Sequence, residues 1–330
     1  MYTDAPAASS PILDALKDAN RVLLLTHVSP DGDAIGSLLA VWHVLHDMGK
    51  TPIALASSAL PDVVATLPGI EHVQVYQRGD VFPEADLVWL VDAATLERTG
   101  PVFEDHEATL REHPLIIVDH HVTNTGPGMI NLIQSSAASC ADVLLRLFQA
   151  MECPITPAVA TCLLLGLTTD TQSFQTTSTK AQSFESAAVL IHHGADHHDV
   201  VKQIFYQTPY ETLKLMGLVY SEMQRDGDIV WVRITRQMME QTGAEDGAYD
   251  DILHLLQRVQ SVRICVLFKE REDGNVKLSL RSTPDFNMAE IARRWGGGGH
   301  AQAAGATLHM DLPTAEREIL PEIRAVCNAS

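Results

Sequence analysis

The sequence predicts an α/β fold with two domains and a cleft between them. The N-terminal domain is expected to hold a parallel sheet with helices on both faces, and the smaller C-terminal domain to be mixed α/β. Three observations predict this. The 330 residues exceed the roughly 100–200 of one average domain, and 46% are apolar. Apolar runs alternate with amphipathic stretches in the first two-thirds, typical of βαβ units. This alternation ends near Tyr206, so we predict domains at 1–205 and 219–330, with a connector helix at 206–218.

The N-terminal domain is expected to begin with a helix capped by Ser10, with Pro11 at its first position. The apolar run at 22–25 is typical of a strand buried on both faces. A helix should then run from about residue 34 and end at Gly49. The pattern from about residue 136 to 199 is mostly helical. The other strand candidates are at 52–55, 73–76, 87–91 and 115–118.

The C-terminal third has a different pattern. A helix is expected at 209–223, followed by the turn Asp226-Gly227-Asp228 and a strand at 229–234. A further helix leads to a hairpin, whose strands at 263–268 and 276–281 flank Asp273-Gly274-Asn275. Another helix precedes the glycines at 296–299, and Ala301 is a candidate start for a further helix.

Composition excludes several classes of protein. With 23 Lys and Arg against 42 Asp and Glu, the net charge is −19, which disfavours binding of long nucleic acid through a basic surface. Five scattered cysteines without a CxxC pair indicate neither a disulfide framework nor a cysteine-ligated zinc site. We see no signal peptide and no apolar run of about 20 residues, so a cytoplasmic location without membrane contact is expected.

Acidic and imidazole side chains follow three of the predicted strands. Each alone is typical of a helix cap or turn, but the carboxyl ends of parallel strands share one edge of a sheet, where ligands bind. Carboxylates gathered there would repel one another unless cations lay between them. The groups are His27, Asp31 and Asp33 after the first strand, Asp92 after 87–91, Asp119, His120 and His121 after 115–118, and Asp170 at the end of an apolar helix.

Four aspartates and two histidines suit two divalent ions with one bridging aspartate. Two such ions can clamp the attacking and leaving oxygens of an in-line displacement at phosphorus. Imidazole among oxygen ligands favours Mn²⁺, while Mg²⁺ stays compatible with the set. A second Asp-His-His at 196–198 follows a helix rather than a strand. There Gly194 is expected to follow the helix end and Asp196 to cap the next helix, so we interpret this copy as structural.

These residues resemble the four motifs of the DHH phosphoesterase superfamily, in the same order. The matching strings are 27–37 (HVSPDGDAIGS), Asp92, Asp119-His120-His121 with Asn124, and Thr169-Asp170-Thr171. The last third resembles the C-terminal domain that accompanies this family, through 278–282 (LSLRS) and 296–305 (GGGGHAQAAG). The length is most similar to that of NrnA-type nanoRNases (oligoribonucleases) and cyclic-dinucleotide phosphodiesterases that lack additional domains.

The resemblance implies a role for each motif residue. His27, Asp31 and Asp92 would bind one ion, and Asp33, Asp92, His120 and Asp170 the other, with Asp92 bridging. Asp119 would orient a histidine, and His121 would face the substrate, stabilising a phosphoryl oxygen or protonating the leaving alkoxide. Two positions depart from the family pattern. Gln172 stands where glycine is common, and residues 139–142 differ from the usual string, so no function is assigned to Asp142.

The glycine run has two interpretations. It can be a flexible stop after a helix, or its backbone N–H groups can form an anion-binding nest. With the family resemblance we favour binding of a substrate phosphate, aided by the positive end of a helix from Ala301. Trp295 is expected in the core. The predicted substrate-binding residues are Arg281, Ser282, Gly297, Gly298, Gly299 and His300.

The sequence therefore predicts a Mn²⁺-dependent phosphodiesterase that hydrolyses oligonucleotides of two to five residues, such as pApA, to mononucleotides by attack of a hydroxide activated by two metals. Removal of phosphate from 3′-phosphoadenosine 5′-phosphate (PAP) fits the same site. The alternatives are a cyclic di-AMP phosphodiesterase and, from another class, a catalytically silent nucleotide sensor. Pyrophosphate, polyphosphate and long single strands are disfavoured as substrates. A homodimer is compatible with the sequence.

Overall fold

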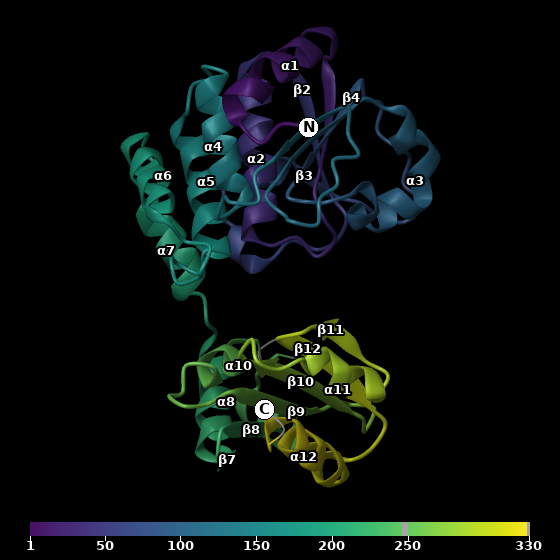
Figure 1. Ribbon diagram of the computed structural model, residues 1–330, viewed down its shortest axis with the longest axis vertical. Coiled ribbons are helices and arrows are strands. Elements are labelled where there is room, and N and C mark those ends of the chain that lie inside the picture. Colours follow the sequence, from purple (N-terminus) through teal and green to yellow (C-terminus); the bar gives the residue numbers. More distant parts are fainter. Residues whose placement is uncertain (246–249, 329–330) are drawn as a thin grey trace. The chain divides into compact units, whose positions relative to one another are not determined.

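The computed structural model describes residues 1–245 and 250–328 (Figure 1). The chain forms two compact units, Met1–Gln207 and Thr208–Ser330. The first contains a parallel sheet and the second a mixed sheet, so the predicted α/β fold class is confirmed.

The sheet of the first unit has six parallel strands in the order β3-β2-β1-β4-β5-β6. Its strands are β1 (Arg21–Leu25), β2 (Thr51–Ala56), β3 (Val73–Val75), β4 (Leu87–Val91), β5 (Leu115–Asp119) and β6 (Ile130–Ile133). The helices are α1 (Ala5–Asp18), α2 (Gly32–Asp47), α3 (Pro101–Glu112), α4 (Cys140–Ala150), α5 (Pro157–Asp170), α6 (Ala181–His192) and α7 (His197–Phe205). Short 3₁₀ turns are η1 (Asp62–Val64), η2 (Ile70–His72) and η3 (Leu96–Thr99).

Helices cover both faces of this sheet, which explains its unbroken apolar strands. In β1, Val22 and Leu24 join the core formed with α1, α2, α4 and α5. Leu23 and Leu25 point to the opposite face and pack in the core that includes α3. The two layers of helices are visible on either side of the sheet in Figure 1.

The second unit is built on six strands in the order β11-β12-β10-β9-β8-β7, in which only the β8–β9 pair is parallel among the described residues. The strands are β7 (Gln224–Asp226), β8 (Ile229–Ile234), β9 (Ile264–Glu270), β10 (Val276–Ser282), β11 (Gly298–His300) and β12 (Ala303–Leu308). The helices are α8 (Tyr210–Ser221), α9 (Arg236–Thr242), α10 (Asp250–Leu256), α11 (Met288–Arg294) and α12 (Leu312–Asn328).

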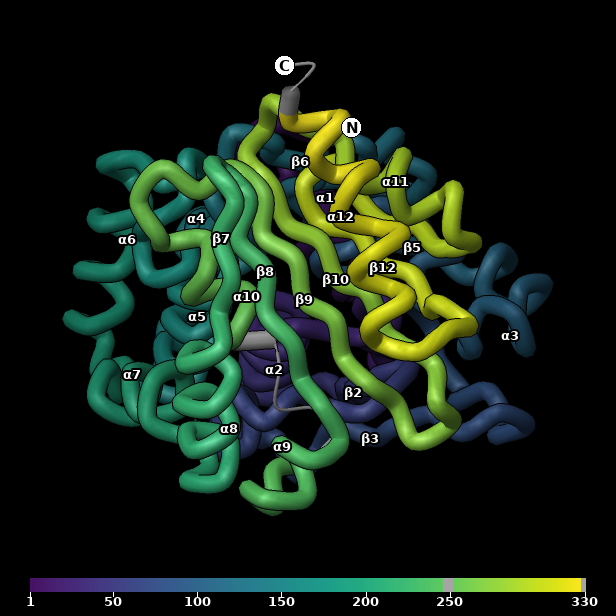
Figure 2. The backbone as a smooth tube through the Cα atoms, turned by 90° about the horizontal axis from the view of Figure 1, so that it is seen from below, coloured from purple at the N-terminus to yellow at the C-terminus, as the bar shows by residue number. Residues whose placement is uncertain are grey.

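This second sheet is also covered on both faces. Val266 and Phe268 of β9 pack with α11 and α12, whereas Cys265 and Leu267 pack with α8, α9 and α10. Leu215 of α8 belongs to the latter core, so this helix packs on the second unit. Figure 2 shows the strands side by side, with α12 on the face toward the viewer.

Several boundaries differ from the prediction. The first helix begins at Ala5 after Asp4, with Pro6 in its first turn, so the predicted cap at Ser10 was wrong and Pro11 lies inside the helix. Pro6 supplies the proline that the first turn of a helix accepts. Strands β6 and β7 were not predicted, because they are short and gain their stability from pairing with a neighbour.

Two predicted details of the second Asp-His-His are confirmed. Gly194 follows the end of α6 with a φ of 88°, and the Asp196 side chain accepts a hydrogen bond from the backbone N–H of Asp199 at the start of α7. This Asp196 is therefore a helix cap.

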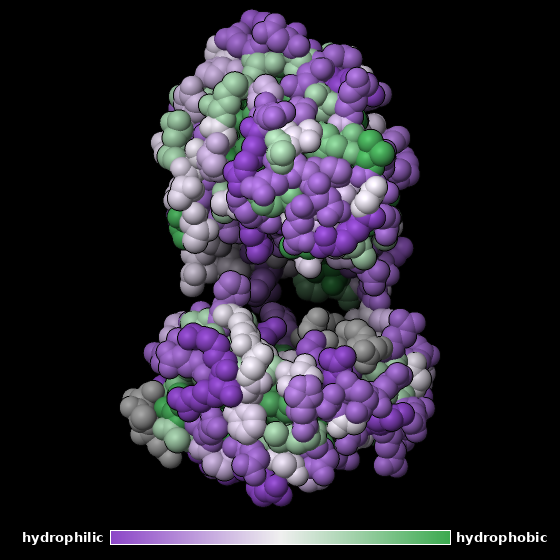
Figure 3. Space-filling model, turned by 90° about the vertical axis from the view of Figure 1, so that its right-hand side faces the viewer, coloured by the Kyte–Doolittle hydropathy of each residue, from purple (hydrophilic) through white to green (hydrophobic). Residues whose placement is uncertain are grey.

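The described surface is predominantly polar on the face drawn in Figure 3, where apolar residues are scattered over both units. Among the described residues, no helix has the length and apolar character needed to span a bilayer.

Two glycines allow α2 and α5 to lie in close contact. A Cβ at Gly36 would lie 2.5 Å from the carbonyl oxygen of Cys162, and one at Gly166 would lie 2.6 Å from Oδ1 of Asp33. Because both obstacles belong to packed helices, neither can yield cheaply. The close approach brings Asp170, at the end of α5, beside the start of α2.

We predict that Gly36→Ala lowers the free energy of unfolding by about 1–3 kcal/mol, because the added methyl group must separate the two helices. Gly217→Ala is the matched control. Gly217 also lies within a helix, but nothing lies within 4 Å of its added Cβ. The control should raise stability by about 0.5–1 kcal/mol through helix propensity alone. Urea unfolding measures both, and equal effects of the two variants would contradict the close-packing argument.

Candidate metal centre

The carboxyl ends of three neighbouring strands bring the predicted ligands together. Strand β4 lies between β1 and β5, so Asp92, directly after β4, is central. Three groups of side chains have candidate ligand atoms within 4.8 Å of one another. They are His27, Asp31 and Asp92; Asp33, His120 and Asp170; and Asp92, His120 and His121. All six predicted ligands are therefore close neighbours.

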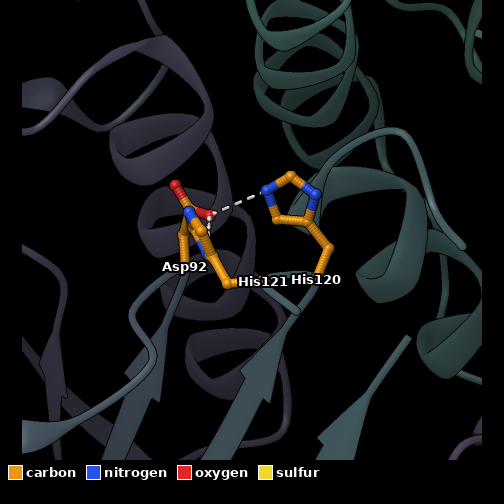
Figure 4. Close-up of side chains that lie close together, drawn as sticks. All are labelled: Asp92, His120 and His121. Atoms are coloured by element: carbon orange, nitrogen blue, oxygen red, sulfur yellow. Dashed lines mark ion pairs between the residues drawn. The ribbon is translucent and has the colours of Figure 1, made fainter. Parts of the chain in front are cut away.

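Asp92 has the clearest features of a metal ligand. It is 3% exposed, and its Oδ1 accepts no hydrogen bond from the described residues. Nε2 of His120 lies 3.5 Å from this oxygen (Figure 4). On the other side, Nε2 of His27 lies 3.5 Å from Oδ2 of Asp92. The backbone of Asp92 is left-handed with a φ of 53°, a conformation that costs a non-glycine residue about 1–2 kcal/mol. A buried, unsatisfied carboxylate in a strained turn fits a metal ligand.

Asp33 is held by the first turn of α4. Its Oδ2 accepts the backbone N–H of Cys140 at 2.6 Å, and its Oδ1 accepts that of Ala141 at 3.0 Å. Ser139 caps this helix by accepting the N–H of Asp142. The positive end of α4 therefore stabilises the charge of Asp33. Asp31 has a comparable local role, because its carboxylate caps α2 through the N–H of Ala34.

Burial and mutual repulsion shift the pKa values of the acidic groups in the cluster. Burial raises the pKa of Asp33 well above its usual range, and the charges of Asp92 and Asp170 add to the effect. Burial also raises the pKa of Asp170 to about 6. Burial alone would raise the pKa of Asp92 too, but the neighbouring His120 and His27 lower it through their positive charge.

The histidines compensate these charges by retaining protons. Burial opposes protonation of His120, yet Asp92, Asp33 and Asp170 together raise its pKa to about 10. Burial opposes protonation of His27 as well, yet Asp92, the Val28 carbonyl and Asp31 together raise its pKa. Protonated His120 therefore supplies positive charge that a bound cation would replace.

Asp119 pairs with His121. Its Oδ1 lies 2.7 Å from Nδ1 of His121, and its Oδ2 accepts a hydrogen bond of 2.7 Å from the amide of Asn124. The bond to Asp119 raises the pKa of His121. Burial would raise the pKa of Asp119, but its bonds to His121 and Asn124 lower it. The His121 side chain is 46% exposed, so Asp119 orients an accessible imidazole.

The backbone after Asp170 bears on Gln172, the position at which the family pattern often has glycine. Gln172, Ser173 and Phe174 have φ values of 48°, 59° and 66°, all in the left-handed region. Glycine adopts this conformation without strain, which accounts for its frequency at the position of Gln172. Phe174 then stacks on Phe184, with ring centroids 4.7 Å apart.

In the second unit, the glycines at 296–299 do not all form the expected anion-binding nest of backbone N–H groups. The N–H groups of Gly296 and Gly297 donate to the carbonyls of Arg293 and Ala292 and so terminate α11. Residues 298–300 form the edge strand β11. The predicted helix from Ala301 was wrong, because Ala303–Leu308 is strand β12, paired with β10. The small residues of β12 permit this approach: a Cβ at Gly305 would lie 2.7 Å from the carbonyl oxygen of Leu278.

The polar residues predicted around this strand lie on β10 and β11. Nη1 of Arg281 donates to the carbonyl of its neighbour Leu280, and its side chain pairs with no carboxylate among residues 1–245 and 252–327. The N–H of Ser282 donates to Gln302. His300 ends β11 and is exposed. Trp295 packs against the core, as predicted. Binding of a phosphate by Arg281, Ser282, Gly297, Gly298, Gly299 and His300 stays a prediction.

Sequence reasoning missed the groups that position the ligands. The two amides of α4 that hold Asp33 lie more than 100 residues away from it, in the segment that departs from the family pattern. Asp142 is part of this support: it is buried, pairs with Arg146 and accepts a hydrogen bond from Ser186 of α6. The glycines that let α2 and α5 approach could have been noticed as glycines within predicted helices.

Comparison with known proteins agrees with this geometry. The family description "DHH family, N-terminal domain" matches residues 21–167, and the "DHHA1 domain" matches residues 228–329. The Thermus thermophilus protein named bifunctional oligoribonuclease and PAP phosphatase NrnA is 32% identical over 92% of this chain and 89% of its own length. The chain belongs to the DHH family. DHH proteins are metal-dependent phosphoesterases, so this chain is a hydrolase of that class.

Two further DHH-type similarities span nearly the whole chain. The cyclic-di-AMP phosphodiesterase GdpP of Geobacillus thermodenitrificans is 24% identical over 95% of this chain, which covers 48% of that protein. The crystal structure of an exopolyphosphatase-related protein from Bacteroides fragilis superimposes with a TM-score of 0.85 at 25% identity, covering 94% of both chains. The predicted resemblance is thus confirmed.

We predict that divalent-metal affinity rises with pH, because ligation needs a neutral His120 and displaces its proton. Below the His120 pKa of about 10, the Mn²⁺ affinity should increase about tenfold per pH unit for one displaced proton. Calorimetry between about pH 6.5 and 8.5, in buffers of different ionisation enthalpy, measures both the affinity and the protons released. His120→Asn should flatten the dependence, and a pH-independent affinity of the native protein would contradict the assignment.

Proposed function

We propose that the protein hydrolyses oligonucleotides of two to five residues, such as pApA, to mononucleotides with the help of two divalent ions, Mn²⁺ first among them. The observation that carries the proposal is the unsatisfied Asp92 carboxylate between His27 and His120, with further carboxylates on both sides. The likeness to the Thermus NrnA protein, named an oligoribonuclease, supports the substrate class.

The donor set fits two ions. His27, Asp31 and Asp92 would bind one, and Asp33, Asp92, His120 and Asp170 the other. The first set is one of the three groups of neighbouring side chains, and the second set consists of another group with Asp92 added. Mixed imidazole and carboxylate ligands suit Mn²⁺. When bound, the ions would lower the pKa of the attacking water and neutralise charge on the phosphoryl oxygens.

The chain itself would control the proton on the leaving side. The contact between Nδ1 of His121 and the Asp119 carboxylate orients the ring and favours its protonated form. Nε2 is then a donor that can stabilise a phosphoryl oxygen or protonate the leaving alkoxide. Asn124 holds the other oxygen of Asp119, so this pair is preorganised.

The charge of the chain supports a short substrate. At −19, the protein would gain little from the counterion release that drives binding of long nucleic acid. Arg281 has no carboxylate partner among the side chains that the structure describes. It is proposed to bind the terminal phosphate of the substrate together with Ser282, Gly297, Gly298, Gly299 and His300.

A second candidate activity is hydrolysis of cyclic di-AMP, because the likeness to GdpP covers 95% of this chain. Removal of phosphate from PAP is a third reaction that the same centre could perform, and the name of the Thermus relative includes it. The alternative from another functional class is a nucleotide sensor without catalytic activity. Measured turnover of any of these substrates would exclude it.

We predict that the Mn²⁺-loaded protein prefers pApA and oligoribonucleotides of up to five residues over cyclic di-AMP, PAP, pyrophosphate and long single strands. His120→Ala should lower turnover by about 10³-fold through loss of a ligand. His197→Ala, the equivalent change in the exposed second Asp-His-His, should leave turnover within about twofold. Chromatography of the products measures both. A preference for cyclic di-AMP would establish the second candidate, and no turnover of any substrate would refute the proposal.

We predict that Arg281→Ala raises the KM for pApA by about tenfold or more with little change in kcat, because a charge-assisted contact to the terminal phosphate is lost. The effect should disappear with ApA, which lacks that phosphate. Arg271→Ala is the control, since Arg271 pairs with Asp273 in the turn between β9 and β10. An equal KM increase for pApA and ApA would contradict binding of the terminal phosphate.

A further inference from the structure

Arg98 lies on η3, the short turn that follows Asp92 along the chain. Its backbone carbonyl accepts a hydrogen bond of 2.7 Å from the N–H of Val28, the residue after His27. Val28 is also in reach of Gly100, whose added Cβ would lie 3.1 Å from the Val28 side chain. The turn is thus attached to the loop that carries His27 and Asp31, at the carboxyl edge of the sheet.

The side chain of Arg98 is the exception among the arginines of the first unit, all of which are described. Arg98 is exposed and its guanidinium has neither an ion pair nor a hydrogen bond within the described chain. The other four arginines each pair with a carboxylate: Arg21 with Glu84, Arg78 with Glu104 and Asp105, Arg111 with Glu97 and Glu107, and Arg146 with Asp142.

The lack of a carboxylate partner for Arg98 among the described residues contrasts with the acidic composition of the first unit. The first unit has nine Lys and Arg residues against 24 Asp and Glu, so acidic partners are abundant. The adjacent Glu97 pairs with Arg111 instead. Leu96 and Thr99 are buried, which fixes the turn that presents Arg98 to solvent. Arg98 thus stands on a turn that is hydrogen-bonded to the loop of His27 and Asp31, and its guanidinium, without a partner among the described residues, is available for an anion.

We propose that Arg98 binds the phosphate group of the substrate at the metal centre and remains in contact with the phosphate of the mononucleotide product. The inference rests on the proposed phosphodiesterase function and adds a residue to it. A guanidinium offers two parallel N–H donors to two phosphate oxygens. In a unit with so many carboxylates, this cation also offsets the repulsion that an anionic substrate meets.

The experiment compares Arg98→Ala with Arg21→Ala. Both remove one arginine from the first unit, but Arg21 is ion-paired at the start of β1, the opposite end of the strand from His27. With Mn²⁺ and pApA, Arg98→Ala should lower kcat/KM by about tenfold or more, Arg98→Lys by less, and Arg21→Ala by less than about twofold. Added guanidinium ion should partly restore the activity of Arg98→Ala.

Two binding measurements separate this inference from the proposed function. The Mn²⁺ affinity of Arg98→Ala should equal that of the native protein, whereas its affinity for AMP in the presence of Mn²⁺ should fall about tenfold or more. Equal AMP affinities, or loss of Mn²⁺ binding in Arg98→Ala, would overturn the inference. If the native protein turned over no phosphodiester but bound AMP in an Arg98-dependent manner, the proposed function would fail and the role of Arg98 as a phosphate ligand would stand.

Discussion

The burial of Asp92 among other carboxylates is the constraint on which the first unit depends. Asp92 leaves the middle of a sheet that helices cover on both faces, so its charge has little access to water. Asp33 and Asp170 lie beside it and add negative charge. Such a group is stable only if protons or cations compensate it. The neighbouring carboxylates raise the pKa values of His27 and His120, so that protons on these imidazoles provide part of the compensation.

Both helix packing and helix ends serve this arrangement. The close contact of α2 and α5 places Asp33 and Asp170 on facing elements, and Gly36 and Gly166 make that contact sterically feasible. The first turn of α4 supplies two N–H groups to Asp33. These supports come from segments that are distant along the chain, so the cluster exists only in the folded protein.

The central strands and the close grouping of the acidic residues could be predicted from the sequence. Apolar runs such as 22–25 and 87–91 mark buried strands directly, and in a parallel sheet their carboxyl ends must share an edge. The assignment of particular ligands to each of two ions came only from the family resemblance, and it remains a prediction.

The remaining features depend on contacts that are not local. Strands β6 and β7 are short, and their pairing rather than their composition defines them. The alanine-rich segment at 303–308 favours a helix by propensity, yet it pairs with β10 because its small side chains fit there. The hydrogen bonds from the amides of α4 to Asp33 could not be predicted from residues 139–142, because this segment differs from the usual sequence of the family.

The hydrogen bonds from α4 to Asp33 connect the carboxylate cluster to helix α6. Asp142, on the same turn of α4, joins Ser186 of α6 through a hydrogen bond of 2.7 Å. Under the proposed ligand assignment, the Asp33 carboxylate is shared between an ion and the first amides of α4, and α4 is in turn hydrogen-bonded to α6. Departure of the ion would leave Asp33 with unbalanced charge and loosen this turn. Amide hydrogen exchange at Cys140 and Ala141 would then depend on metal occupancy, and exchange in α6 would change with it.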